Sequence, residues 1–441
     1  MTASSMEELV SLCKRRGFIF QSNDIYGGIK GLYDYGPMGV ELKNNIANYW
    51  WKEMTRNHEN IVGLDSGILM HPKIWEASGH IGEFHDPLVD CKQCKSRFRA
   101  DEFSKEYQKL IWKEVKCPKC GTTGELTDPR QFNLMFKTSV GPVEESGTEA
   151  FLRPETAQGI YVNYQLVQGA MRMKVPFGIA QIGKAFRNEI IARNFIFRTR
   201  EFEQMEMQYF VKPGKDDDSL IDWKNKRLKF YHQKLGVSKS KLRFHEHKNE
   251  ELAHYAKEAW DIEYEFPFGW SEIEGIHNRT DFDLRRHQEF SGKNLLYFDQ
   301  PNNDKFLPYI IETSAGLNRM LLTVLSDAYW EDSENNRIVM KIDPRIAPVK
   351  AVICPLVKKD GLPEKARKIV DQLKPLYRVI YDQQGSIGKR YYRQDEAGTP
   401  FGITVDHQSL EDDTVTIRHR DTQKQERVSS EQILNVLKDN I

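Results

Sequence analysis

Residues 177–209 read FGIAQIGKAFRNEIIARNFIFRTREFEQMEMQY, and this stretch decides which fold we expect. It predicts two strands, over 177–189 and 200–209, joined by a basic loop. Side chains alternate between the two faces of a strand, so every second residue shares a face. One face of the pair therefore gathers polar and aromatic residues: Gln181, Arg187 and Glu189 from the first strand, and Arg200, Phe202, Gln204 and Glu206 from the second.

Such a face is too polar for a core and favours a binding site. Arginine suits phosphate, glutamate suits an amine, and an aromatic ring can stack on a base. The alternative is a solvated outer face with ion pairs. The segment 306–328 favours the binding site, because it predicts a strand with Glu312 and Ser314 on one face. An Ala-Gly turn follows, and then a helix is expected from Leu317 to Ala328. Arg319 lies in the first turn of this helix, off its apolar stripe, and a helix N-terminus attracts anions.

The composition is that of a globular protein with no global charge bias. The 441 residues are 39% hydrophobic and 29% charged, with 64 Lys plus Arg against 64 Asp plus Glu. These values exclude a disordered or collagen-like chain. No apolar run approaches 18 residues, and Ser5 with Glu8 predicts a capped helix where a signal peptide would lie. We therefore expect a cytoplasmic protein.

Four cysteines form two CxxC pairs, Cys91 with Cys94 and Cys117 with Cys120, 22 residues apart. Two such turns can complete a tetrahedral zinc site, and four thiolates leave no open position for catalysis, so we expect structural zinc. Two unrelated turns or a redox pair are the alternatives. Cys13 and Cys354 are expected to be buried free thiols.

The chain is expected to have two main parts. The first, residues 1–345, contains two insertions: the cysteine-rich module 88–130 and a segment 212–265. In the second insertion we expect charged helices over 223–235 and 250–260. The sequence Asp-Pro-Arg-Ile-Ala-Pro at 343–348 marks a boundary. Residues 346–441 then alternate strands and helices, which predicts a small α/β domain.

Three motifs resemble those of the class II aminoacyl-tRNA synthetases. Phe186-Arg-x-Glu and Arg200-Glu-Phe-x-Gln resemble motif 2, Gly316-Leu-x-Arg resembles motif 3, and the expected helix 39–57 resembles motif 1. Further segments are similar to the dimeric glycyl-tRNA synthetase family of subclass IIa. These are 31–39 (GLYDYGPMG), 75–80 (WEASGH), 152–158 (LRPETAQ), 272–276 (EIEGI) and 311–316 (IETSAG). Residues 385–391 (GSIGKRY) and 398–401 (GTPF) resemble the anticodon-binding domain that the class IIa enzymes share.

The resemblance implies an α+β fold, with an antiparallel-sheet catalytic domain, inserted modules and a small α/β anticodon-binding domain. It implies a homodimeric ligase that forms glycyl-adenylate from glycine and ATP and transfers glycine to the 3′ ribose of tRNA(Gly). Threonine stands at position 313, where the family pattern has proline, but Glu312 and Ser314 remain in place.

The resemblance also assigns roles. Arg187 and Arg319 are the implied catalytic residues, Glu272 is the implied ligand of Mg²⁺ carried by ATP, and Glu274 is expected on the strand face of Glu272. For ATP the assigned residues are Arg187, Asn188, Glu189, Phe197, Arg198, Thr199, Arg200, Glu201, Phe202, Glu272, Ile273, Gly316, Leu317, Asn318 and Arg319. For glycine they are Arg99, Glu155, Phe202, Glu203, Gln204, Met205, Glu206, Glu312, Thr313, Ser314, Ala315 and Gly316.

Three other functions remain open at this point. The first is a synthetase for serine, threonine or proline, which the segments around Glu155 and Glu312 disfavour. The second is a non-catalytic relative, which would have lost Arg187 and Arg319. The third is a zinc-ribbon nucleic-acid protein, which explains only 91–120. For anticodon bases we expect contacts from Arg390, Tyr391 and Arg393, because splayed bases stack on aromatic and basic side chains.

Overall fold

A seven-stranded sheet forms the centre of the computed structural model, which describes residues 5–142, 147–248, 250, 252–253 and 255–441. The strand order is β12-β13-β14-β17-β11-β10-β3, antiparallel except for the parallel pair β10 and β3. Its strands are β3 (Ile61–Gly63), β10 (Phe177–Phe186), β11 (Glu201–Val211), β12 (Leu242–Glu246), β13 (Glu258–Phe266), β14 (Gly269–Thr280) and β17 (Tyr309–Gly316).

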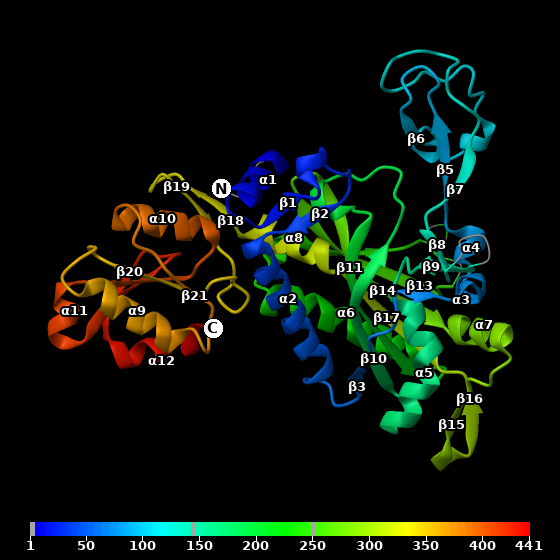
Figure 1. The fold of residues 1–441 in the computed structure, drawn as a ribbon. Helices are drawn as coiled ribbons and strands as arrows, with labels where there is room; N and C mark the ends of the chain where they lie inside the picture. The colour runs from blue at the N-terminus through cyan, green and yellow to red at the C-terminus, as the bar shows by residue number, and fades with distance from the viewer. Residues whose placement is uncertain (1–4, 143–146, 249, 251, 254) are drawn as a thin grey trace.

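One face of this sheet is covered by helices α2 (Pro37–Thr55), α6 (Asp216–Lys229) and α8 (Leu317–Ala328), as Figure 1 shows. The main hydrophobic core lies between them and the sheet. Trp50 of α2, Trp223 of α6 and Leu321 of α8 are buried there against Met205 and Ile311 of the sheet. The bounds of α8 agree with the prediction. Because apolar residues occupy this face of β11 and β17, their alternating polar residues must face the other way.

Two helices cover one end of the opposite face. Helices α5 (Ala157–Met171) and α7 (Phe282–Ser291) pack there, with Tyr164 of α5 against Phe177 and Phe210 of the sheet. The remainder of this face carries the polar side chains of β11, β14 and β17. The combination of helices with a mainly antiparallel sheet confirms the predicted α+β class.

The predicted helix over 250–260 is wrong. Residues 249, 251 and 254 lie outside the described part of the chain, and strand β13 begins at Glu258 and pairs with β12 and β14. Alternation explains the strand, because Ile262, Tyr264 and Phe266 are buried while Glu265 is exposed. The segment 212–265 therefore supplies α6, a helix as expected, and two strands that extend the sheet.

The cysteine-rich module has its own small sheet, in the order β6-β5-β7, and projects away from the rest of the molecule (Figure 1). Its strands are β5 (His85–Asp90), β6 (Arg97–Arg99) and β7 (Arg130–Asn133). Val89, Ala100, Trp112 and Leu126 form a hydrophobic cluster separate from the main core. The module is thus packed independently of the central sheet.

Residues beyond 350 form a second sheet, in the order β21-β20-β22-β23-β24, with a core of its own. β20 is parallel to β21 and β22, as expected of strands alternating with helices. The strands are β20 (Ala351–Pro355), β21 (Val379–Tyr381), β22 (Phe401–Val405), β23 (Thr414–His419) and β24 (Gln425–Ser429). The helices are α9 (Leu362–Leu373), α10 (Ile387–Ala397), α11 (His407–Asp412) and α12 (Ile433–Asn440).

The remaining elements surround the two sheets. The helices are α1 (Met6–Arg15), α3 (Pro72–Ala77) and α4 (His80–Glu83). The strands are β1 (Ile19–Gln21), β2 (Tyr33–Tyr35), β4 (Leu69–Met70), β8 (Lys137–Val140), β9 (Thr148–Leu152), β15 (Tyr297–Asp299), β16 (Asp304–Phe306), β18 (Tyr329–Asp332) and β19 (Arg337–Met340). Ser5 accepts from the Glu8 N–H at 3.3 Å, which confirms the predicted cap of α1. Among the described residues, no helix is both long and apolar enough to cross a bilayer.

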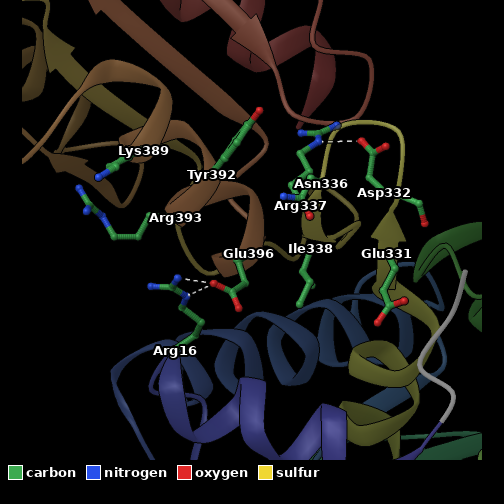
Figure 2. Close-up of a pocket in the computed structure, with 11 residues that line it drawn as sticks. Arg16, Glu331, Asp332, Asn336, Arg337, Ile338, Lys389, Tyr392, Arg393 and Glu396 are labelled. Carbon is green, nitrogen blue, oxygen red and sulfur yellow. Dashed lines mark hydrogen bonds and ion pairs between the residues drawn. The ribbon is translucent and has the colours of Figure 1, made fainter.

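Helix α10 joins the second sheet to the first part of the chain. Its buried Asp395 accepts hydrogen bonds from Arg418 of β23, at 2.8 and 2.9 Å, and from Arg337 of β19. Glu396 pairs with Arg15 at the end of α1 and with the following residue, Arg16. Arg16 and Glu396 line a cleft of about 710 Å³, as Figure 2 shows. Charged contacts thus hold the two parts together.

Helix α10 also corrects the expected anticodon contacts. Arg390 is buried and donates to the carbonyl oxygens of Gly385 and Pro355, and Tyr391 is buried with its hydroxyl against Thr404. These two side chains support the backbone of the domain and are not available to splayed bases. Arg393 lines the cleft, as Figure 2 shows, and remains a predicted contact.

Candidate active site

The uncovered face of the central sheet holds a cavity of about 200 Å³ between β11, β14 and β17, which we call the basin. Its floor comes from alternate residues of β11 and β17, as the sequence predicted. Fifteen predicted site residues line it: Glu155, Arg187, Glu189, Phe197, Arg198, Thr199, Phe202, Gln204, Glu206, Glu272, Glu312, Ser314, Gly316, Asn318 and Arg319.

Strand alternation also removes five predicted residues from the basin. Glu201, Glu203 and Met205 lie on the other face of β11, where Glu201 pairs with Lys184, Glu203 pairs with Lys43 and Met205 is in the core. Thr313 and Ala315 are buried on the corresponding face of β17. Their side chains therefore do not line the basin, because a continuous run of residues alternates between the two faces of a strand.

A β-bulge in β14 decides which of its residues face the basin. Ile262 of β13 pairs with Glu274, whereas the next residue, Glu263, pairs with Glu272, so Ile273 is the extra residue. Glu272 therefore lines the basin, but Glu274 is buried against Arg227 of α6 at 2.6 Å and Ile273 lies in the core. The predicted shared face of Glu272 and Glu274 is wrong, and the side chain of Ile273 is not part of the basin lining.

Four further predicted residues have their side chains elsewhere. Arg99 of the cysteine module pairs with Asp86 at 2.8 Å, Arg200 donates to the Glu189 carbonyl oxygen at 2.9 Å, and Leu317 is buried in the core. The loop residue Asn188 is also outside the basin lining. Arg200 follows a bend at the strand end, so strand alternation does not extend to it.

Five residues without a predicted site role complete the lining: Ile196, Tyr255, Gly275, His277 and Arg279. Gly275, His277 and Arg279 alternate along β14 beyond the bulge. The two-residue period therefore predicts that they share a face, but which face they share depends on the bulge. Tyr255 comes from the segment between β12 and β13, and its ring lies 3.7 Å from the Arg279 guanidinium carbon. No local pattern predicts that contact, which depends on the tertiary fold.

Two arginines occupy the mouth of the basin. Arg187 lies 5.3 Å from the ring centres of both Phe84 and Phe202, and its Nε donates to the Pro154 carbonyl oxygen at 3.0 Å. Arg319 lies 4.4 Å from the Phe197 ring. Such contacts with aromatic rings hold a guanidinium in place. Arg187 has further N–H groups available to an anion, whereas Arg319 also contacts the Glu272 carboxylate at 3.0 Å.

The carboxylates at the base carry unequal charge. Burial raises the pKa of Glu312, but the charges of Arg279 and His277 outweigh it and bring the pKa to about 2. Burial likewise raises the pKa of Glu155, and its contact with His80 at 3.3 Å helps bring the net pKa below its usual range. Burial, reinforced by the charges of Glu312 and Glu155, raises the pKa of Glu206 to about 8. At neutral pH, two of the three are ionised.

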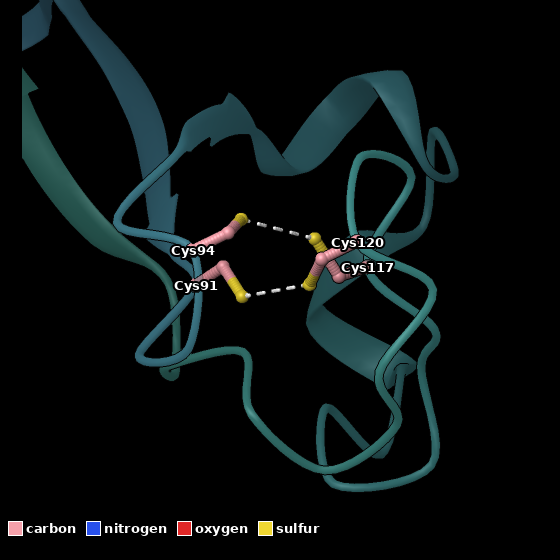
Figure 3. Close-up of side chains that lie close together, drawn as sticks. All are labelled: Cys91, Cys94, Cys117 and Cys120. Atoms are coloured by element: carbon pink, nitrogen blue, oxygen red, sulfur yellow. Dashed lines mark hydrogen bonds between the residues drawn. The ribbon is translucent and has the colours of Figure 1, made fainter.

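The four paired cysteines of the module converge on one point (Figure 3). Their sulfur atoms lie within 4.8 Å of one another, with 3.7 Å between Cys91 and Cys120 and 3.8 Å between Cys94 and Cys117. Hydrogen bonding to Thr122 lowers the pKa of Cys120 to about 6, which favours the thiolate that metals bind. The cluster can therefore hold a metal ion.

Comparisons with known proteins agree with this geometry. The model of the tRNA synthetase class II core domain (G, H, P, S and T) matches residues 136–328, and the model of the anticodon binding domain matches 350–440. The glycine–tRNA ligase of Treponema denticola is 58% identical over 445 residues, covering 99% of this chain and 97% of that protein. The chain belongs to the glycine–tRNA ligase family.

Other members of the glycine–tRNA ligase family are similar over the same extent. That of Borrelia hermsii is 56% identical, covering 96% of this chain and 94% of its own, and that of Borreliella burgdorferi is 52% identical, covering 99% and 97%. The class II core match includes β10, β11, β14 and β17, the strands that form and support the floor of the basin. The resemblance predicted from motifs 2 and 3 is confirmed.

Proposed function

We propose that the basin is the place where this glycine–tRNA ligase activates glycine with ATP and transfers it to the 3′ ribose of tRNA(Gly). The observation that carries this is the arrangement of charges. Glu155, Glu206 and Glu312 lie at the base, where an ammonium group would be held, and Arg187 and Arg319 lie at the mouth, where phosphates would be held. Glycyl-adenylate carries the same order of charges, an ammonium group followed by a phosphate.

ATP would bind between the two arginines. Arg187 would hold the α-phosphate and the glycine carboxylate, and Arg319 the γ-phosphate end, so that charge developing on phosphate oxygens meets fixed cations. Phe202 would stack on the adenine and Glu189 would accept from its amino group. ATP would bring Mg²⁺, with Glu272 as a carboxylate ligand. Glu272 lies 3.0 Å from Arg319, so phosphate and metal would replace this ion pair together.

The reaction needs no covalent enzyme intermediate. The glycine carboxylate attacks the α-phosphorus and pyrophosphate leaves; the ribose hydroxyl of tRNA then attacks the glycyl carbonyl and AMP leaves. Catalysis would come mainly from holding the reactants together in orientation and from electrostatic stabilisation. Glycine offers no side chain to bind, so selection would rest on its ammonium group and on lack of space beside its α-carbon.

Amino-acid-dependent ATP–pyrophosphate exchange tests this function. We expect exchange with glycine, and at least about 10²-fold less with alanine, serine, threonine or proline, because a closed pocket excludes larger side chains. Exchange with another of these amino acids would keep the class but contradict the glycine pocket. Absence of exchange with every amino acid, from folded protein, would favour a non-catalytic relative.

We also propose that the cysteine cluster holds structural zinc. With Zn–S bonds of about 2.3 Å, tetrahedral geometry places sulfur atoms about 3.8 Å apart, close to the distances between Cys91 and Cys120 and between Cys94 and Cys117. Four thiolates would saturate the ion, so it would stabilise the module without taking part in catalysis.

Metal analysis tests the zinc. We expect one zinc per chain, its loss in the double variant Cys91→Ser/Cys117→Ser, and its retention in Cys354→Ala. Because the module has a separate hydrophobic cluster, removing zinc should raise hydrogen exchange over 91–120 and leave the central sheet protected. Zinc-free protein with unchanged exchange in this range would contradict a structural metal.

Three broader assignments complete the proposal. We divide the chain into a catalytic part, 1–345 with insertions 88–130 and 212–265, and an anticodon-binding domain, 346–441, supported by their separate cores. We propose a homodimer, supported by exposed Ile25 and Tyr26 in the loop between β1 and β2. Because ATP and tRNA are both cytoplasmic substrates, we place the protein there.

A further inference from the structure

Two of the three carboxylates at the base of the basin have close contacts with basic side chains. Glu312 contacts Arg279 Nη1 at 3.1 Å and accepts from His277 Nδ1 at 3.0 Å. Burial lowers the pKa of His277, but its contacts with Asp261 and Glu312 raise it to about 9, so this imidazole is protonated at neutral pH. Glu155 lies 3.3 Å from His80 Nε2. Each of these carboxylates is therefore stabilised as an anion before any substrate arrives.

Glu206 is in a different position. Its hydrogen-bond partners are both neutral: the Ser314 hydroxyl donates at 3.1 Å and the Gln208 side-chain amide donates at 3.3 Å. No ion pair to Glu206 is found among the described residues, and the side chain is only 1% exposed, so water does not screen its charge. A buried carboxylate without a counter-charge is stabilised by binding a proton.

The neighbours of Glu206 reinforce this effect. The same Gln208 amide donates to Glu312 at 2.9 Å, so two carboxylates lie on either side of one NH₂ group. The ionisable groups that interact with Glu206 from the surrounding strands and loops are Glu312 of β17, Glu155 before α5, Tyr161 of α5, Arg153, and Arg279 of β14. The two carboxylates oppose ionisation of Glu206, and Arg279 is already bound to Glu312 and Asp283.

We propose that Glu206 carries a proton in the empty basin and that the ammonium group of glycine replaces it, so that substrate binding releases one proton. This inference rests on the proposed function. The O–H bond of Glu206 breaks, the proton passes to a water or buffer base, and a substrate N–H then donates to the carboxylate that forms. Charge in the basin is thereby conserved, because one cation enters as another leaves.

This exchange makes the charge of the substrate amine a basis of selection. A ligand of similar size but without an ammonium group leaves Glu206 protonated and forgoes the charge-assisted contact. Arg279 and His277 are then positioning residues, because by holding Glu312 as an anion they leave Glu206 as the carboxylate that exchanges. The raised pKa of Glu206, about 8, agrees with a proton held there under neutral conditions.

Calorimetry on the full chain tests the exchange with two matched ligands. Glycyl-sulfamoyl-adenosine carries the ammonium group, whereas its hydroxyacetyl counterpart carries a hydroxyl at the same place. Titration at pH 6.5 in buffers of different ionisation enthalpy gives the protons released by each. We expect the difference between the ligands to be about one proton, since a group of pKa about 8 is nearly fully protonated at that pH.

Two matched variants assign the proton. In Glu206→Gln the difference should fall to about zero, with weaker binding of the glycyl ligand. In Glu312→Gln the opposing charge is removed, so release should persist only at lower pH and be smaller at pH 6.5. The wild-type measurement decides the question even if either variant folds poorly.

The possible outcomes distinguish failure of the proton exchange from failure of the proposed function. Tight binding of the glycyl ligand with equal proton release for both ligands would overturn the exchange and leave the proposed function standing. A difference of one full proton between the two ligands in Glu206→Gln would likewise overturn the exchange. Unchanged affinity for the glycyl ligand in both glutamine variants would instead show that glycine does not bind at the base of the basin. Both the proposed glycine site and the proton exchange would then be wrong.

Discussion

We expect ATP–pyrophosphate exchange to fall about 10²- to 10³-fold when Arg187 is replaced by alanine. Its guanidinium lies between the rings of Phe84 and Phe202 and uses one N–H on Pro154, which leaves the other donors for the α-phosphate and the glycine carboxylate. Removing it takes a fixed cation away from the oxygens on which charge develops. Steady-state exchange at saturating ATP and glycine measures the loss.

Arg193 provides the control, because it lies six residues after Arg187, in the basic loop. Its side chain is exposed, lies outside the basin and contacts only Glu102, at 3.4 Å, among its described ion pairs. Arg193→Ala should retain exchange within about twofold, since loss of an exposed pair costs little. Thermal unfolding should be similar for both variants. If Arg187→Ala kept wild-type exchange, the α-phosphate assignment would be wrong.

The second large effect concerns stability. Replacing Asp395 with alanine should destabilise the protein by about 3–5 kcal/mol, because buried Arg418 then loses its counter-charge and buried Arg337 keeps only its contact with Asp332. Arg418 donates two hydrogen bonds to Asp395 from within the same domain, and Arg337 reaches it from β19. Urea unfolding, followed with a probe in each part of the chain, measures the change.

Asp371→Ala is the matched control, because among the described residues that exposed carboxylate pairs only with Lys374, just after the end of α9, and its removal should cost less than about 1 kcal/mol. Asp395→Ala should also reduce transfer to tRNA more than ATP–pyrophosphate exchange, since the basin contains no part of α10. Equal stability of the two variants would show that the buried cluster does not hold the two parts together.

Sequence patterns predicted the elements with a clear period. The apolar stripe of 317–328 gave the bounds of α8, and alternation placed Phe202, Gln204, Glu206, Glu312 and Ser314 on one floor. The same rule, applied consistently, would have excluded Glu203 and Met205. Their predicted site roles follow from the family resemblance, which covers consecutive residues, and not from the alternation of the strand.

The rest depended on contacts that local sequence does not contain. The bulge at Ile273 changes the phase of β14, and with it the direction of Glu274, His277 and Arg279, although no glycine or proline occupies the bulged position itself. Glu258 to Trp260 is charged and aromatic, which fitted a surface helix, but pairing with β12 and β14 makes it a strand. Tertiary pairing outweighed local preference in both places.

The order of strands in the central sheet has a consequence for synthesis on the ribosome. The cysteine module closes within residues 85–133, so a growing chain can complete it early. In contrast, β17 lies between β14 and β11 and pairs Ser314 with Glu206, more than one hundred positions earlier. The two halves of the sheet cannot join until β17 emerges. Until then β11 has an unpaired edge, a state that favours aggregation. The nascent chain is therefore most prone to aggregate between the synthesis of β11 and the emergence of Glu312 from the ribosome.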